Sequence, residues 1–485
     1  MIKAVIVTEG YKYTGYGHIT RCTAIAKAFQ QLNNVDVSFI LNGDKPALTL
    51  LADYNTVVLN WLEEEEQLIE RLSACDIVVV DSYLAAETIY ESIAETVGTC
   101  LFLDDFNRID YPPGIIVNGT VGTEILTYPS QAKSDLLLGR KYVLLRPPFP
   151  DMPPRTFFKE RIETILITFG GTDLLGLSQI VLPILTAAYP DVKKYVILGS
   201  SFSEANKIEL LGDEQTVFFR NVTAEEMGKL MAEADVAVSA AGQTINELGR
   251  TGLPTVIFKV AANQENNIKG WIESGFITTY IDATQPWSVD ELLDALAALE
   301  TADIRKKRSL LGQSVIDGKG AIRVGKAAVS SHCIKKMRIA KATDADLIPL
   351  FHLANDQEVR KQSFSTNPIT LQEHSNWFLS VLKNTNRLLF VFFVCDSFVG
   401  QVRMDIADAK AVVSISLQAE YRGLGLASEM LRLALSELKK ERIEVELVCA
   451  YVKEDNIASQ KLFLKAGFLS CDCEKEKTLK YYYSL

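Results

Sequence analysis

Short apolar runs that end in glycine or a polar residue recur along the first two-thirds of the chain, and they constrain its fold more than any other feature. Five of them, in order, read KAVIVTE, DVSFIL, DIVVVDSY, TCLFLDD and GIIVNG. Between the first two, HITRCTAIAKAFQQL places apolar side chains on one face at helical spacing. Continuous rather than alternating apolarity is typical of parallel strands covered by helices on both faces. The sequence therefore predicts a doubly wound α/β sheet.

The pattern restarts after the proline-dense stretch RPPFPDMPP, residues 146–154. The second set of predicted strands lies in ETILITFGGTD, KKYVILGS, TVFFRN, DVAVSAAG and PTVIFKV. Two such halves joined by a hinge predict a cleft in which a ligand binds beyond the carboxyl ends of the strands.

A third region begins near Met337, after residues 317–336, which are polar, basic and rich in small side chains, as expected of a helix end plus a connector. In this region RLLFVFFVCDSFVGQVRMDI predicts a hairpin that turns near Asp396 and Ser397. The predicted fold class is α/β, a pair of Rossmann-type domains followed by a smaller α+β domain. The predicted boundaries are 1–148, 155–325 and 337–485.

Composition narrows the class of protein. The chain has 485 residues and a net charge of −11, which argues against a general nucleic-acid binder. It contains no run of about 18 apolar residues, so no membrane insertion is expected, and MIKAVIVTEGYKY is interrupted too soon for a signal peptide. The eight cysteines form no CxxC pair, which favours reduced thiols in a cytoplasm and no metal site.

The opening loop GYGHITRC carries a histidine at the start of a predicted helix. His18 is the sole histidine among the first 331 residues. Gly15 and Gly17 allow close backbone approach, and the helix N-terminus attracts anions. A histidine there can serve as a proton acceptor facing a bound substrate, or it can simply cap or pack the helix start.

Two further turns follow strands of the second half. FGGTD contains Gly170, Gly171 and Thr172, whose N–H groups could hold a diphosphate, although an ordinary strand-to-helix turn looks the same. SAAGQTINELGRTGLPTVIF places Asn246 and Glu247 early in a helix, where a carboxylate can accept from two ribose hydroxyls or can balance the helix dipole.

Taken together, these stretches resemble the GT-B architecture, in particular the MurG-like nucleotide-sugar enzymes. GYGHITRC, VVVDSYLA, LFLDDFNR, GRKYVLLR, FGGTD, NELGRTGLP and NQENN resemble, in order over residues 1–325, the PseG family of UDP-2,4-diacetamido-2,4,6-trideoxy-β-L-altropyranose hydrolases of pseudaminic acid biosynthesis. The resemblance implies that water attacks the anomeric carbon and UDP leaves. It implies catalytic roles for His18 and Tyr83, with Ser82 where the family often has histidine.

The same resemblance implies a set of substrate-binding residues. They are Gly15, Gly17 and Arg21 in the opening loop, Gly170, Gly171, Thr172 and Asn246 on the diphosphate side, Glu247 at the ribose, and Asn263 and Gln264 on the sugar side. Asp104 and Asp105 could be metal ligands, but a structural or hydrogen-bonding role is favoured because adjacent side chains on a strand point apart.

The C-terminal region has its own signature. In EYRGLGLASEML, Arg422, Gly425 and Ala427 fit the pattern Arg-x-x-Gly-x-Ala, whose N–H groups would cradle a pyrophosphate. NIASQKLFLKAGF follows with Asn456. The pair resembles the GNAT acetyltransferases over about residues 337–480. The resemblance implies acetyl-CoA as co-substrate, held by Ser416, Leu417, Arg422, Gly423, Gly425, Ala427 and Asn456.

One position departs from that family. Many GNAT enzymes have a tyrosine seven residues after the asparagine to protonate the leaving thiolate, and this chain has Phe463. Tyr451 and the tyrosines near the C-terminal end are possible substitutes. The domain could also be impaired.

Residues 354–378 resemble the PseH family, GNAT enzymes that acetylate the 4-amino group of the preceding UDP-sugar. Asn355, Arg360, His374 and Trp377 lie in matching stretches. Trp377 could stack on a sugar or uracil, or pack in a helix, and His374 could be a base or a surface residue.

The expected function is therefore hydrolysis of the UDP-diacetamido sugar, fused to N-acetylation of a UDP-amino sugar. Two alternatives stay open. The first half could be a glycosyltransferase that passes the sugar to an acceptor, and the GNAT half could acetylate a different amino sugar or serve only as a binding module.

Overall fold

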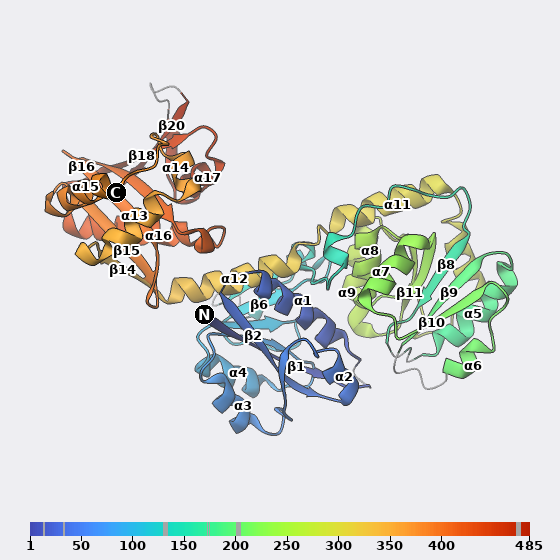
Figure 1. Ribbon diagram of the computed structural model, residues 1–485. Coiled ribbons are helices and arrows are strands. Elements are labelled where there is room, and N and C mark those ends of the chain that lie inside the picture. The colour runs from blue at the N-terminus through green and yellow to red at the C-terminus, as the bar shows by residue number, and fades with distance from the viewer. Residues whose placement is uncertain are drawn as a thin grey trace. The chain divides into compact units, whose positions relative to one another are not determined.

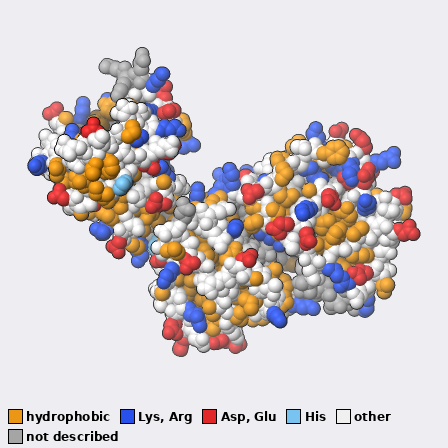
Figure 2. Space-filling view, viewed as in Figure 1, with side chains coloured by type: hydrophobic (Ala, Val, Ile, Leu, Met, Phe, Trp, Pro, Cys, Tyr) orange, Lys and Arg blue, Asp and Glu red, His pale blue; other side chains and the backbone are white. Residues whose placement is uncertain are grey.

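The computed structural model describes residues 1–12, 15–32, 34–129, 134–171, 173, 175–199, 205–471 and 477–485. The chain divides into two compact units, Met1–Ala328 and Val329–Leu485, here called the N-terminal and C-terminal units (Figure 1). None of the helices in the described ranges combines the length and the hydropathy needed to cross a membrane. Lys and Arg side chains are interspersed with Asp and Glu over the face of the molecule shown in Figure 2.

The first lobe of the N-terminal unit is a seven-stranded parallel sheet in the order β3-β2-β1-β4-β5-β6-β7. Its strands are β1 (Ile2–Gly10), β2 (Val35–Gly43), β3 (Asn55–Val58), β4 (Ile77–Asp81), β5 (Cys100–Leu103), β6 (Ile115–Asn118) and β7 (Asp135–Leu138), and its helices are α1 (Gly17–Gln31), α2 (Lys45–Thr49), α3 (Glu65–Leu72) and α4 (Glu87–Thr96). The sequence did not predict β3 and β7. Both are edge strands with partly exposed side chains, so they lack a continuous apolar run.

The second lobe is a six-stranded parallel sheet in the order β10-β9-β8-β11-β12-β13. Its strands are β8 (Thr164–Thr168), β9 (Lys193–Leu198), β10 (Thr216–Arg220), β11 (Val236–Ala240), β12 (Thr255–Lys259) and β13 (Tyr280–Asp282), and its helices are α5 (Leu177–Ala188), α6 (Ala205–Glu209), α7 (Ala224–Glu233), α8 (Thr244–Thr251), α9 (Glu265–Glu273), α10 (Val289–Ala297) and α11 (Ala302–Val315). In β8, Leu166 packs into one apolar cluster while Ile165 and Ile167 pack into another. The strand is thus buried on both faces, which confirms the prediction from its continuous apolarity.

The two lobes touch through backbone. Val121, in a loop of the first lobe, is buried in an apolar cluster of the second lobe beside Ile268 and Trp271. A Cβ on Gly270 of α9 would lie 2.0 Å from the carbonyl oxygen of Val121. Glycine is therefore required where α9 meets this loop, and the contact fixes one side of the space between the lobes.

Residues 317–336 are mostly one helix, α12 (Gly320–Lys335), so the expected helix end plus connector is wrong. Its small residues are packing positions: Ala321 clusters with Ala24 and Ala28 of α1, and Gly325 also lies against Ala28. Small side chains look like a linker in sequence, but here they let two helices approach closely.

The C-terminal unit is built on a seven-stranded sheet in the order β14-β15-β16-β17-β18-β20-β19. Its strands are β14 (Met337–Lys341), β15 (Arg387–Val394), β16 (Ser397–Ala407), β17 (Lys410–Leu417), β18 (Leu447–Lys453), β19 (Leu469–Cys471) and β20 (Thr478–Ser484), and its helices are α13 (Leu347–Ala354), α14 (Gln357–Gln362), α15 (Leu371–Lys383), α16 (Leu426–Glu441) and α17 (Ile457–Lys465). The predicted hairpin is confirmed, because β15 and β16 pair antiparallel and turn at Cys395 and Asp396. β17 and β18 form a parallel pair, whereas the other paired strands of the sheet are antiparallel.

The contact between the lobes yields the first prediction. Gly270→Ala is expected to destabilise the N-terminal unit by about 1–3 kcal/mol, because the added methyl group overlaps the Val121 carbonyl. Calorimetric unfolding of the full chain measures the change. Gly325→Ala in α12 is the matched control, since its Cβ meets neighbours no closer than 3.4 Å. Equal transitions for the two variants would contradict a tight lobe contact.

Candidate active sites

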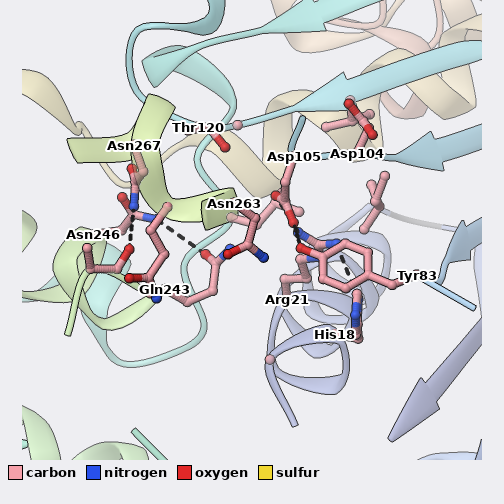
Figure 3. A pocket seen from close by; sticks show the side chains of 18 residues that line it. His18, Arg21, Tyr83, Asp104, Asp105, Thr120, Gln243, Asn246, Asn263 and Asn267 are labelled. Carbon is pink, nitrogen blue, oxygen red and sulfur yellow. Dashed lines mark hydrogen bonds and ion pairs between the residues drawn. The ribbon is translucent and has the colours of Figure 1, made fainter. Parts of the chain in front are cut away.

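A cavity of about 250 Å³ opens in the N-terminal unit, with walls from both lobes (Figure 3). Seven of the residues predicted from sequence line it: Gly17, His18, Arg21, Tyr83, Asn246, Asn263 and Gln264. Gly15, Gly170, Gly171 and Glu247 are not among its lining residues, and Thr172 lies outside the described residues. Asp104, Asp105, Thr120, Gln243 and Asn267 line the cavity without having been assigned a binding role from sequence.

The ring of His18 is held by a hydrogen bond to a carboxylate. Its ring, 5% exposed, lies in the first turn of α1, and its Nδ1 is 2.6 Å from Oδ1 of Asp81, the fully buried last residue of β4. An ionised carboxylate only accepts, so Nδ1 carries the proton in this hydrogen bond, and Nε2 is the ring nitrogen that can accept one. Nε2 bonds to none of the residues that the structure describes. The arrangement leaves a proton acceptor at the cavity.

Arg21 joins two carboxylates. One turn along α1 from His18, its Nε and Nη2 donate to Asp81 at 2.5 Å, and its Nη1 donates to both oxygens of Asp105 at 2.6 and 2.7 Å. Burial alone would lower the pKa of Arg21, but the charges of Asp105 and Asp81 raise it well above its usual value. Burial likewise would raise the pKa of Asp81, yet Arg21 and His18 lower it strongly. The Arg21 guanidinium is therefore engaged by side chains of the first lobe.

Tyr83 stands beside the histidine. Its ring meets that of His18 edge-on with centroids 4.3 Å apart, and its hydroxyl donates to Asp105. Burial and the Asp105 charge raise its pKa, so the hydroxyl stays protonated. Buried Glu9, near the end of β1, accepts from the backbone N–H of Tyr83 at 2.8 Å and from Ser82 Oγ at 2.5 Å. Ser82 thus fixes the loop that carries Tyr83.

The adjacent Asp104 and Asp105 have different partners. Asp104 accepts from the hydroxyls of Tyr111 at 2.9 Å and Tyr128 at 2.6 Å, whereas Asp105 bonds to Arg21 and Tyr83. These contacts agree with the hydrogen-bonding role favoured from sequence. Across the described residues, His, Cys, Asp and Glu side chains do not gather in a group of three or more able to hold a metal ion.

The second lobe supplies an amide wall. Gln243 and Asn246 at the start of α8, Asn263 and Gln264 in the turn before α9, and Asn267 in the first turn of α9 line the cavity. Figure 3 shows Gln243, Asn246 and Asn267 across the cavity from the ionic cluster. Asn246 donates to Gln243 at 3.2 Å and accepts from Trp271 Nε1 at 3.3 Å. Next to it, Glu247 forms an ion pair of 2.8 Å with Arg146 of the proline-rich hinge. A ribose at Glu247 would therefore share its carboxylate with Arg146.

In the C-terminal unit, β17 and β18 part after a short pairing. They pair from Lys410 to Val412 and no further, so Ser416 and Leu417 border the opening. Gly423 and Gly425 both have positive φ, and a Cβ on Gly425 would meet nothing within 4 Å. Gly425 begins α16, and Ala427 lies in its first turn. This backbone cradle at a helix N-terminus fits a pyrophosphate.

Two polar residues of this signature hold loops through their side chains. Arg422 donates to the Leu417 carbonyl at 2.9 and 3.0 Å and to Asp356 at 2.6 Å, which ties the cradle to the start of α14. Asn456 caps α17 by accepting from the backbone N–H of Ser459 at 3.0 Å. Both side chains are thus engaged by other parts of the C-terminal unit.

Four residues of the PseH-like stretch, residues 354–378, make contacts within the C-terminal unit. His374 is buried against Phe351, Trp377 and Phe378, so its interpretation as a surface residue is wrong, while its role as a base stays a prediction; burial lowers its pKa. Trp377 packs on the apolar cluster of this unit, with Arg403 over its ring.

Asn355 bonds to the backbone of Ile369, and Arg360 bonds to carbonyls of the same loop. Phe463 is buried against Phe468 and Tyr481, and its side chain has no proton to give.

Comparison with known proteins also separates the C-terminal unit from the rest of the chain. Residues 336–469 match the family described as "Acetyltransferase (GNAT) domain". Over the whole chain, an uncharacterized protein of Methanocaldococcus jannaschii is 24% identical, with 96% of each chain covered. The spore coat polysaccharide biosynthesis protein SpsG of Bacillus subtilis is 23% identical over 66% of this chain and 95% of its own.

Two further matches are a curated relative and a solved structure. The pseudaminic acid cytidylyltransferase and UDP-2,4-diacetamido-2,4,6-trideoxy-beta-L-altropyranose hydrolase of Helicobacter pylori is 24% identical over 53% of this chain and 44% of its own. The crystal structure of MurG from Acinetobacter baumannii matches with a TM-score of 0.50 at 15% identity, over 67% of this chain and 99% of its own.

The resemblances to a MurG-like GT-B fold, to the UDP-diacetamido sugar hydrolases and to the GNAT acetyltransferases are confirmed. The resemblance of residues 354–378 to the PseH family stays a prediction. The chain combines a GT-B fold with a GNAT acetyltransferase domain, and acetyl-CoA is the co-substrate of that domain. Its relatives with named roles work in sugar biosynthesis.

The ionic cluster yields the second prediction. Arg21→Met is expected to lower the free energy of unfolding by about 3–5 kcal/mol at pH 7, because two carboxylates lose their cation. In the wild type the lowered pKa of Asp81 gives stability above its usual pKa that is lost as the pH falls. In the variant the lowering by Arg21 is lost while burial still raises that pKa, so protonation of Asp81 relieves part of the damage and the deficit is smaller near pH 4 than at pH 7.

Urea unfolding at both pH values measures the deficit. Arg161→Met, at an exposed arginine, is the matched control and is expected to change stability little. A deficit that is the same at both pH values would show that Arg21 contributes packing rather than charge.

Proposed function

We propose that the N-terminal unit hydrolyses a UDP-activated sugar at the bond between the anomeric carbon and the diphosphate. The substrate we infer is UDP-2,4-diacetamido-2,4,6-trideoxy-β-L-altropyranose, the nucleotide sugar in the name of the Helicobacter pylori relative. The observation that carries the proposal is the His18–Asp81 pair, which offers an accepting nitrogen at the cavity.

In this reaction His18 Nε2 takes a proton from water as the water oxygen bonds to the anomeric carbon. The bond from that carbon to the diphosphate oxygen breaks, and UDP leaves with the electron pair. Asp81 holds the ring in the productive tautomer and stabilises the imidazolium that forms. The balanced products are the free sugar and UDP, with the proton passing from His18 to solvent.

Other residues position this pair or receive the nucleotide. Arg21 keeps Asp81 ionised, and Tyr83 closes one side of His18. Gly170 and Gly171, where an added Cβ would meet no atom within 4 Å, follow β8 and can offer N–H groups to the diphosphate. Because UDP leaves as a stable anion, such donors suffice for the leaving group.

For the C-terminal unit we propose N-acetylation of the 4-amino group of the preceding UDP-sugar. The acetyl-CoA that the domain uses supplies the acetyl group as a thioester. Ser416, bonded to Gln401 at 3.4 Å, lies on β17 beside the opening, on the same face of the sheet as Arg403. The last pair between β17 and β18 is Val412 with Cys449. Tyr451 of β18 and Ser414 of β17 each lie two residues beyond it, on that same face of the sheet. These polar groups flank the place where the amine would be acetylated.

Full-length protein incubated with the UDP-diacetamido sugar and no acceptor tests the hydrolysis. Mass spectrometry is expected to find free sugar and UDP in equal amounts. Turnover that begins only after an acceptor alcohol is added would make the unit a glycosyltransferase instead. Adding acetyl-CoA to the 4-amino nucleotide tests the acetyl transfer in the same way.

The third prediction concerns His18. His18→Gln is expected to reduce the rate of UDP release by about 10²–10⁴-fold, the contribution of a general base, because glutamine cannot take up the proton. Acetyl transfer by the same preparation is the control and is expected to stay at the wild-type rate. UDP release within a few-fold of wild type would remove His18 from the mechanism.

The fourth prediction concerns the backbone cradle. Gly425→Glu is expected to abolish CoA binding measured by calorimetry, because a carboxylate would occupy the open space beside the N–H groups. Since the change lies in the C-terminal unit, UDP release is expected to be unchanged, which also reports that the chain is folded. Retained CoA affinity would place the cofactor elsewhere.

A further inference from the structure

Asn267 presents a buried acceptor without a donor. Its side chain, on α9, is 9% exposed and lines the cavity (Figure 3). Nδ2 donates to the carbonyl of Ala241 at 3.1 Å, and because a carbonyl only accepts, this bond fixes which end of the amide is oxygen. Oδ1 accepts a hydrogen bond from none of the residues that the structure describes. Buried acceptors are rarely left in that state, so a ligand donor fits here.

The charges around the cavity select the kind of donor. Asp81 and Asp105 are neutralised in part by Arg21 and accept hydrogen bonds from His18 and Tyr83. Asp104 is occupied by tyrosine hydroxyls, and Glu247 pairs with Arg146. The amide wall around Asn267 is uncharged. A neutral N–H finds its acceptor on this wall, whereas an ammonium group finds no carboxylate there.

We propose that Asn267 Oδ1 accepts a hydrogen bond from the N–H of an acetamido group of the sugar, and that this contact makes the cavity select N-acetylated over free amino nucleotides. This rests on the proposed function and adds the group that sets its specificity. It also orders the chemistry: N-acetyl transfer, the reaction class of the C-terminal domain, must act before the sugar leaves UDP.

Calorimetric titration of the full chain carrying His18→Gln, which does not consume the nucleotides, tests the contact. The probes are UDP, the UDP-diacetamido sugar and its two counterparts with a free amine at either position. We expect the diacetamido nucleotide to bind about tenfold or more tighter than one of the amino counterparts, a ratio typical of a buried amide left unpaired. Adding Asn267→Asp is expected to erase or invert this ratio, because a carboxylate attracts the ammonium.

Three comparisons make the result specific. Asn266→Asp places the same charge one residue away, outside the set of residues that line the cavity. It is expected to keep the ratio of affinities measured for the chain that carries His18→Gln alone. Affinity for UDP alone is expected to stay within about twofold of wild type in every variant, which shows that the fold is retained. Asn267→Ser is expected to weaken binding of the diacetamido nucleotide without any gain for the amino nucleotide, since it removes the acceptor and adds no charge.

An unchanged ratio in Asn267→Asp, or an equal loss for UDP and all three sugars, would overturn the inference. Wild-type turnover is measured separately. If the acetamido preference is present but the wild type releases no UDP, hydrolysis fails while the contact stands. If UDP is released but the ratio does not depend on Asn267, hydrolysis stands and the contact fails.

Discussion

The buried cluster of His18, Arg21, Asp81 and Asp105 is the interaction on which the N-terminal site depends. Two carboxylates from the ends of neighbouring strands would be costly to bury next to each other without a cation. Arg21 supplies it from α1, with bonds of 2.5–2.7 Å to both. The same helix carries His18 one turn earlier, so the ion pairs that dock α1 on the sheet also aim the imidazole at the cavity.

The fold makes the two walls of this cavity chemically different. The first lobe presents His18, charged side chains and the Tyr83 hydroxyl, which suit proton transfer, and the second lobe presents uncharged amides, which suit recognition of hydroxyl and acetamido groups. Val121 and Gly270 bring the walls together by direct backbone contact. In the C-terminal unit, the candidate cofactor site consists mainly of backbone: the loop with Gly423 and Gly425, and the opening between β17 and β18. The side chain of Arg422 holds this loop to Asp356.

Much of this could be predicted from the sequence because it is local. Continuous apolar runs predicted the two parallel sheets, and the glycine loop with His18 predicted one wall of the cavity. Asp81 stands in the quoted stretch VVVDSYLA, yet its role depends on a partner 63 residues away, and spacing along the chain does not reveal it. A carboxylate that ends a strand buried on both faces was the available signal. Asn267 was missed for the same reason, since its free oxygen is defined by the bond of its Nδ2 to Ala241, 26 residues away in the chain. His374 was misread because its burial among aromatic rings depends on tertiary packing.

In the proposed reaction, the water that His18 activates attacks the anomeric carbon of the sugar. The reaction run in H₂¹⁸O under single-turnover conditions, with the masses of both products determined, shows which atom the water attacks. Attack at the anomeric carbon gives one ¹⁸O atom in the released sugar and none in UDP. Label in UDP would instead place the attack at phosphorus and rule the proposed reaction out.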